Sequence, residues 1–129
     1  MRRILVVDDE HATNLLSSDY LRLAGFEVRS CFDGESALQV LETDPGFDLV
    51  VMDKRMPGMG GVEAAKAIRR GERTAKILIV LLSASLQPSQ IAEIDGELRA
   101  DAYIPKPFSP QNLVSTIKRL IDAVAAEKP

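Results

Sequence analysis

The strongest constraint on the fold is a fivefold alternation of apolar runs with segments of helical periodicity along the 129 residues. This order is typical of repeated strand–helix units and predicts a mostly parallel sheet. We expect strands near 3–8, 26–30, 47–53, 76–82 and 102–104. We expect helices near 12–24, 34–43, 61–70, 88–99 and 110–125, with a frayed tail over 125–129.

The predicted strands differ in ways that order them within the sheet. Residues 4–7, 49–52 and 77–82 are continuously apolar, which is typical of central strands covered on both faces. Residues 26–30 alternate between apolar and polar, and the fifth strand is short, as edge strands often are. These properties predict a doubly wound α/β domain, a single (βα)5 flavodoxin-like unit with strand order 2-1-3-4-5 and its crevice between the first and third strands.

Chemically reactive side chains follow the predicted strands. Asp53 closes a solid apolar run, Asp8 and Asp9 follow the first strand, and Ser83 and Lys106 follow the fourth and fifth. The carboxyl ends of parallel strands form one rim of a sheet, so these residues should meet in one pocket. Taken singly, Asp9 could be a helix cap, Ser83 a partner for backbone groups and Lys106 a solvated surface charge. Their convergence carries the functional interpretation.

The charges of this set indicate its chemistry. Three clustered carboxylates raise one another's pKa unless a cation lies among them, and Mg²⁺ (or Mn²⁺) prefers oxygen ligands. With the metal and the Lys106 ammonium present, the pocket could accept a phosphoryl group, whose transfer depends mainly on positioning and charge neutralisation. Asp53 is the natural nucleophile and would form an acyl phosphate.

Composition agrees with one ordinary domain. The chain is 46% hydrophobic, and its net charge of −3 provides no basic face for nucleic acid. No segment approaches transmembrane length. The single Cys31 cannot form an internal disulfide, which suits a reducing cytoplasm.

Three motifs give the chain a family resemblance. They are Val-Asp-Asp-Glu at 7–10, Met-Asp-Lys-Arg-Met-Pro-Gly at 52–58 and Tyr-Ile-Pro-Lys-Pro-Phe at 103–108. In this order, at the ends of successive strands, they resemble the receiver domains of response regulators in two-component signalling, across essentially the whole chain. The resemblance implies one phosphoacceptor domain over 1–129, which catalyses only its own phosphorylation and dephosphorylation and so is no enzyme with an outside product.

The resemblance also implies roles for individual residues. Asp8, Asp9, Asp53 and the main-chain carbonyl of Arg55 would hold Mg²⁺. Asp53 would take the phosphoryl group and Lys106 would pair with its oxygens.

Two further residues would respond to phosphorylation. Ser83 would turn inward to hydrogen-bond the phosphoryl group, and Tyr103 would switch between exposed and buried rotamers. As a plainer interpretation, Tyr103 is a half-covered aromatic of an edge strand.

Loop geometry and rate tuning are further expectations from the family. The Lys106–Pro107 bond should be cis. Gly60 stands where relatives often have aspartate, which makes the loop before the third helix permissive. Arg55 and Ser85 occupy positions that tune the lifetime of the acyl phosphate, although solvated loop charge explains Arg55 equally well.

Partners follow from the same resemblance. The phosphoryl donor would be a histidine kinase or histidine phosphotransfer protein. The only histidine of this chain, His11, is not expected to carry the phosphoryl group, so the donor histidine would belong to another protein. The donor would dock on Asn14, Leu15, Ser18 and Phe108, beside Pro107. The downstream target would bind the fourth helix, Tyr103 and the fifth helix.

Oligomeric state and chain context are weaker expectations. Asn112 and Thr116 replace the Glu and Arg of a common receiver dimer, so a monomer or weak dimer is expected. The chain would act by docking if complete, or within a larger regulator or hybrid kinase if it is a fragment.

Two other functions are possible on this fold, a small phosphatase and a flavin binder. A dehalogenase-type phosphatase would need an acid two residues after its nucleophile, where Arg55 stands. A flavin phosphate would be repelled by the acidic run after the first strand unless a metal were bound. Both are less consistent with the charges than the receiver interpretation.

Overall fold

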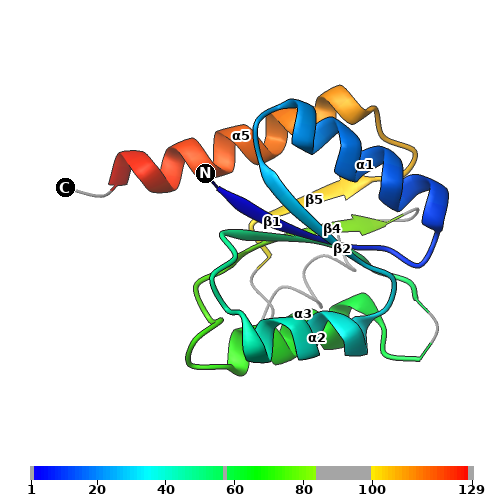
Figure 1. The fold of residues 1–129 in the computed structure, drawn as a ribbon, viewed down its shortest axis with the longest axis vertical. Coiled ribbons are helices and arrows are strands. Elements are labelled where there is room, and N and C mark those ends of the chain that lie inside the picture. The colour runs from blue at the N-terminus through cyan, green and yellow to red at the C-terminus, as the bar shows by residue number, and fades with distance from the viewer. Residues whose placement is uncertain (1, 57, 84–99, 128–129) are drawn as a thin grey trace.

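In the computed structural model, five parallel strands form one sheet in the order β2-β1-β3-β4-β5 (Figure 1). The structure describes residues 2–56, 58–83 and 100–127. The sheet confirms the predicted flavodoxin-like topology, with the two predicted edge strands at its edges. The strands are β1 (Arg3–Val7), β2 (Glu27–Cys31), β3 (Leu49–Asp53), β4 (Leu78–Ser83) and β5 (Ala102–Pro105).

Helices cover both faces of the sheet. Helices α1 (His11–Leu23) and α5 (Pro110–Glu127) lie on one face, and α2 (Gly34–Thr43) and α3 (Gly61–Arg70) lie on the other (Figure 1). Helix α5 continues to Glu127, so residues 125–127 belong to the helix and not to a tail. The predicted helix at 88–99 lies outside the described residues. No helix in the described part of the chain is both long and apolar enough to span a membrane.

Alternation along the central strands builds two apolar clusters, one on each side of the sheet. Leu5, Val50 and Met52 face the cluster beneath α2 and α3. Ile4 and Val51 face the cluster beneath α1 and α5. All five side chains are fully buried, which explains why the central strands are apolar at every position.

Strand register brings the reactive residues to one edge. Val7 pairs with Met52, so the residue after β1 lies beside the end of β3. Asp53 pairs with Leu82, and the end of β4 pairs with Pro105 at the end of β5. Asp53 and Ser83 therefore end their strands and Asp8 and Lys106 directly follow theirs, all at one edge, as predicted from the sequence.

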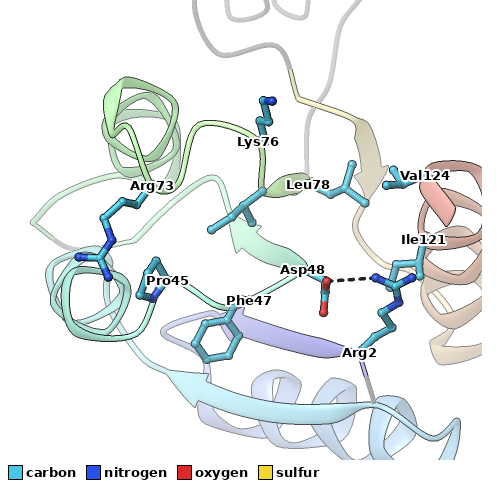
Figure 2. A pocket seen from close by; sticks show the side chains of 10 residues that line it. Arg2, Pro45, Phe47, Asp48, Arg73, Lys76, Leu78, Ile121 and Val124 are labelled. Carbon is cyan, nitrogen blue, oxygen red and sulfur yellow. Dashed lines mark hydrogen bonds and ion pairs between the residues drawn. The ribbon is translucent and has the colours of Figure 1, made fainter. Parts of the chain in front are cut away.

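The opposite edge of the sheet carries a separate hollow of about 330 Å³ (Figure 2). An ion pair of 3.4 Å joins Arg2 and Asp48 at its side. Asp48 also accepts a hydrogen bond of 2.8 Å from the main-chain nitrogen of Arg3. The residues lining it are Arg2, Pro45, Phe47, Asp48, Arg73, Lys76, Ile77, Leu78, Ile121 and Val124. This hollow lies at the amino ends of the strands, away from the acidic pocket.

Candidate functional site

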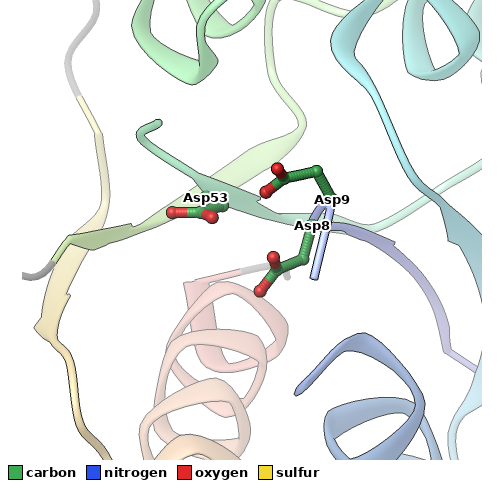
Figure 3. A group of neighbouring side chains, drawn as sticks. All are labelled: Asp8, Asp9 and Asp53. Carbon is green, nitrogen blue, oxygen red and sulfur yellow. The ribbon is translucent and has the colours of Figure 1, made fainter. Parts of the chain in front are cut away.

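Three carboxylates converge at the carboxyl edge of the sheet (Figure 3). Asp8 and Asp9 follow β1 and Asp53 ends β3, and one oxygen of each lies within 4.8 Å of the others. Asp8 and Asp53 are buried, with 1% and 7% of their surface exposed, whereas Asp9 is more exposed. The set offers only oxygen ligands, reachable from solvent through Asp9, and so fits a hard divalent cation such as Mg²⁺.

Lys106 neutralises part of this acidic pocket. Its Nζ lies 3.2 Å from Asp8 Oδ2 and 3.2 Å from Asp53 Oδ2. The main-chain nitrogen of Lys106 donates a 2.8 Å hydrogen bond to the Ser83 carbonyl, which fixes the end of β5 against β4. The Lys106–Pro107 peptide bond is cis, the isomer expected above.

Burial and crowding alter the acid–base properties of the pocket. Desolvation, with a further contribution from the Asp8 charge, raises the pKa of Asp53 to about 6, although Lys106 opposes the rise. Desolvation acts to lower the pKa of Lys106, but Asp8 and Asp53 outweigh it, so that this pKa is raised. The pocket therefore holds a firmly protonated lysine beside a carboxylate that is costly to ionise.

Helix α1 supports the pocket through buried polar contacts. The Asn14 amide nitrogen donates to the main-chain oxygens of Asp8 at 3.0 Å and Cys31 at 2.8 Å. The Ser18 hydroxyl lies 2.8 Å from that of Ser30. Asn14 and Ser18 are both 0% exposed. The docking prediction for these two residues is therefore wrong, because buried side chains cannot contact a partner.

An exposed groove lies beside these buried residues. It measures about 370 Å³ and lies between α1 and the segment joining β5 to α5. Leu15 and Leu16 on α1 are 50% and 51% exposed. Phe108 and Leu16 line the groove, whereas Leu15 does not, and the sequence analysis missed Leu16. The lining residues are Glu10, Thr13, Leu16, Ser17, Lys106, Pro107, Phe108 and Pro110.

The remaining predicted residues lie around the pocket. Ser83 is 3% exposed at the end of β4. Tyr103 on β5 is partly buried against the apolar cluster beneath α2 and α3. Arg55 is exposed, and its main-chain nitrogen lies 3.4 Å from Asp53 Oδ1. Ser85 lies outside the described residues.

Glu35, in the first turn of α2, was not predicted from the sequence as a residue near the site. Its Oε1 accepts a 2.9 Å hydrogen bond from the main-chain nitrogen of Met59, in the loop that follows Asp53. A glutamate in the first turn of a helix is common because it complements the helix dipole, so the sequence offers no signal for this tertiary contact.

Comparison of the sequence with known proteins identifies a family that is consistent with the acidic pocket. Residues 4–118 match the family described as the response regulator receiver domain. The transcriptional regulatory protein CpxR of Escherichia coli is 36% identical over 122 residues, which are 94% of this chain and 50% of CpxR. The phosphate regulon transcriptional regulatory protein PhoB of Pseudomonas aeruginosa is 36% identical over 123 residues, 93% of this chain and 52% of PhoB. The chain thus spans about half the length of these curated relatives.

Solved structures show the same fold. The chemotaxis protein CheY4 of Vibrio cholerae superposes with a TM-score of 0.85 at 31% identity, covering 92% of this chain and 98% of CheY4. A receiver domain protein of Methanospirillum hungatei reaches a TM-score of 0.89 at 26% identity and covers 99% of each chain.

Proposed function

The chain belongs to the family of response regulator receiver domains, and on that premise we propose that Asp53 accepts a phosphoryl group from a phosphohistidine on a partner protein. Receiver domains of two-component response regulators act in signal transduction. The observation that carries the proposal is the Lys106 ammonium, 3.2 Å from both Asp8 and Asp53. A half-buried cation between two buried acids suits a site where negative charge is to be added.

The residues of the pocket have separate roles in this transfer. An Asp53 carboxylate oxygen would attack phosphorus while the bond from phosphorus to the donor nitrogen breaks. The electron pair of that bond goes to the nitrogen, and a donor ring protonated on its other nitrogen leaves as a neutral imidazole. Lys106, which directly follows β5, would pair with the phosphoryl oxygens. Ser83, at the end of neighbouring β4, would donate a hydrogen bond to another of them. The product is an acyl phosphate on Asp53, and no outside substrate is converted.

A divalent cation is part of the proposal. Receiver domains bind Mg²⁺ at an acidic pocket, and the oxygens of Asp8, Asp9 and Asp53 gather closely enough to share one ion. We propose that these three carboxylates and the main-chain carbonyl of Arg55 hold Mg²⁺ or Mn²⁺. When bound, the ion supplies charge neutralisation for the incoming phosphoryl group.

The consequence of phosphorylation would be a change in the surface that binds a downstream target. Ser83 and Tyr103 lie on adjacent strands, and Tyr103 is only partly buried, so movement at Ser83 could be transmitted to it. The proposed partners are a histidine kinase or histidine phosphotransfer protein as donor, and a target protein or output domain as receiver of the signal. The proposed setting is the cytoplasm, as a monomer or weak dimer.

The relatives extend this proposal to a longer protein. CpxR and PhoB are named as transcriptional regulatory proteins and are about twice as long as the stretch they share with this chain. We propose that a receiver of this kind can work within a larger regulator. The expectation of no nucleic-acid contact therefore stays a prediction about this domain alone.

The groove beside α1 is the proposed docking site for the phosphohistidine donor, since it borders Lys106 and Phe108. The Leu16→Asp substitution should slow phosphoryl transfer from the cognate donor about tenfold or more, because an acid replaces an exposed apolar residue that lines the groove. Phosphorylation by acetyl phosphate should be unchanged. The measurement is the transfer rate from radiolabelled donor.

Leu23→Asp is the matched control for this variant, because Leu23 lies on the same helix and is 84% exposed. Equal slowing by both substitutions would contradict docking at the start of α1.

The experiment that tests the function is intact mass after incubation with acetyl phosphate and Mg²⁺. Wild type should gain one phosphoryl group in a base-labile, acid-stable form, and Asp53→Asn should gain none. A chelator should abolish the gain. Phosphorylation that persists in Asp53→Asn would place the acceptor elsewhere and overturn the proposal.

A further inference from the structure

We infer that Glu35 is a positioning residue that holds the loop between β3 and α3 in the geometry required for metal binding. The inference rests on the proposed function, because this loop carries Arg55, whose main-chain carbonyl is a proposed ligand. Glu35 itself lies on α2, outside the acidic pocket. It would act through the loop and not by touching the metal.

Few polar contacts hold this loop, although Met56 is buried in the apolar cluster beneath α2 and α3 and Met59 packs against that cluster. Residues 54–60 include Lys54 and Arg55 but no acid, and two of the seven are glycine. Gly60 caps α3 without a side-chain hydrogen bond. Gly58 has a φ of +75°, in the left-handed region that glycine adopts most readily. An anchor from another element is therefore valuable here.

Helix α2 supplies that anchor. Glu35 Oε1 accepts a 2.9 Å hydrogen bond from the Met59 main-chain nitrogen. The loop also packs closely on the start of α2, because a Cβ added at Gly58 would lie 3.1 Å from Glu35 Oε1. A Cβ at Gly34 would lie 3.1 Å from the Met59 carbonyl oxygen. Glu35 thus fixes the far part of the loop against the first turn of α2.

The near part of the loop is held independently. The Gly61 main-chain nitrogen donates to the Lys54 carbonyl at 2.9 Å, and a Cβ at Gly61 would lie 1.9 Å from the Asp53 carbonyl oxygen. Arg55 lies between these two attachments. Loss of the Glu35 contact should therefore loosen the segment that presents the Arg55 carbonyl and leave the Asp53 backbone and the overall fold in place.

Two explanations of any Glu35 effect must be separated. The carboxylate could act by accepting the Met59 hydrogen bond, as we infer, or by adding negative charge near a cation site. Glu35→Gln keeps an acceptor at the same position and removes the charge. Glu63→Ala removes an equivalent charge from the first turn of neighbouring α3, where Glu63 is exposed, and so controls for charge alone.

The test is a Mg²⁺ titration followed by amide NMR spectra of wild type and the three variants, Glu35→Ala, Glu35→Gln and Glu63→Ala. Glu35→Ala should weaken Mg²⁺ binding about threefold to tenfold. Loss of a group that orients a metal ligand typically weakens metal binding about 10–100-fold, and we expect a smaller effect here because the Glu35 contact is exposed. The Met59 amide of this variant should exchange faster with solvent. Glu35→Gln and Glu63→Ala should stay within about twofold of wild type.

Specific outcomes would overturn the inference. One is that Glu35→Ala leaves both the Mg²⁺ affinity and the exchange rate of the Met59 amide unchanged. The other is that Glu35→Gln weakens Mg²⁺ binding as much as Glu35→Ala does, which would mean that the charge and not the hydrogen bond matters. Phosphorylation of wild type by acetyl phosphate is scored separately. A wild type that binds Mg²⁺ but takes no phosphoryl group would contradict the proposed function, while the binding data would still decide the role of Glu35.

Discussion

At the scale of single residues, the desolvated charge of Asp53 lowers the free energy of unfolding. Its carboxyl is buried beside Asp8, which raises its pKa from 3.8 to about 6. The folded protein therefore binds a proton at Asp53 more tightly than the unfolded chain does. Between these two pKa values the free energy of unfolding falls as pH rises, and the full penalty is present above pH 6.

Replacing Asp53→Asn should remove this penalty. In chelator at pH 7, we expect the free energy of unfolding to rise by about 1–2 kcal/mol, because a neutral amide takes the place of a desolvated charge. This is less than the roughly 3 kcal/mol of the full shift, because the pocket opens to solvent near Asp9. Urea unfolding of both proteins at pH 7 and pH 4.5 measures the difference.

The pH dependence is the control for that prediction. The gain should shrink toward zero near pH 4, where wild-type Asp53 is protonated in the folded state. A gain of equal size at both pH values would mean that the amide stabilises the fold by packing, and that the Asp53 charge is not the cause.

Residues at strand ends were predictable, and residues on helices were less so. Asp8, Asp53 and Lys106 were predicted to lie together because the carboxyl ends of parallel strands meet at one edge of a sheet. Asn14 was predicted from the family resemblance to contact the donor, and its burial was not foreseen because the sequence does not show its two main-chain carbonyl partners. Glu35 was missed because its partner is a main-chain nitrogen in a distant loop.

At the scale of elements, α1 packs through polar side chains. Asn14, Ser17 and Ser18 are buried residues of this helix, together with Leu21. Small polar residues let the helix approach the end of β1 closely while Asn14 satisfies two main-chain oxygens. The helix thereby fixes the backbone that presents Asp8 to the pocket.

Replacing Asn14→Ala should lower the free energy of unfolding by about 1–3 kcal/mol, because the main-chain oxygens of Asp8 and Cys31 lose a buried donor. Urea unfolding in chelator measures the loss. Leu15→Ala, at the adjacent half-exposed position, should change stability by no more than about 0.5 kcal/mol. A loss in Asn14→Ala no greater than in the control would show that the amide hydrogen bonds contribute nothing net.

Element boundaries followed the strength of the sequence pattern. The carboxyl ends of the three central strands were predicted closely, because their apolar runs end abruptly at Asp8, Asp53 or Ser83. Helix α5 was predicted to stop at 125 but continues to Glu127. Its apolar periodicity stops with Val124, and the sequence pattern beyond that point no longer distinguishes helix from tail.

At the scale of the whole molecule, the two edges of the sheet are built differently. At the amino edge, Arg3 pairs with Glu27 at 2.5 Å and Asp44 at 2.6 Å and lies 4.3 Å over the Phe47 ring. The Arg3 hydrogen bond lowers the pKa of Asp44 to about 2. At the carboxyl edge, Lys106 pairs with two of the three clustered acids, Asp8 and Asp53. Each of these acids at the amino edge therefore has an arginine partner, whereas Asp9 at the carboxyl edge is paired with no cation in the described part of the chain.

This asymmetry predicts that Mg²⁺ stabilises the whole domain. At a concentration tenfold above its dissociation constant, Mg²⁺ should add about 1.4 kcal/mol to the free energy of unfolding, because it binds the folded pocket and not the dispersed acids. For a domain of this size, the melting temperature should rise by about 3–6 °C. Thermal unfolding followed by circular dichroism, with Mg²⁺ or with NaCl of equal ionic strength, measures the rise.

The rise should depend on the pocket and on pH. Asp9→Asn should lose most of it, since Asp9 is the most exposed of the three acids and removing its charge disturbs the core least. The rise should be smaller at pH 5 than at pH 7.5, because below its pKa of about 6 Asp53 holds a proton that the cation must displace. An equal rise with NaCl, or in Asp9→Asn, would assign the stabilisation to general screening of the acidic chain and contradict a metal site at this edge.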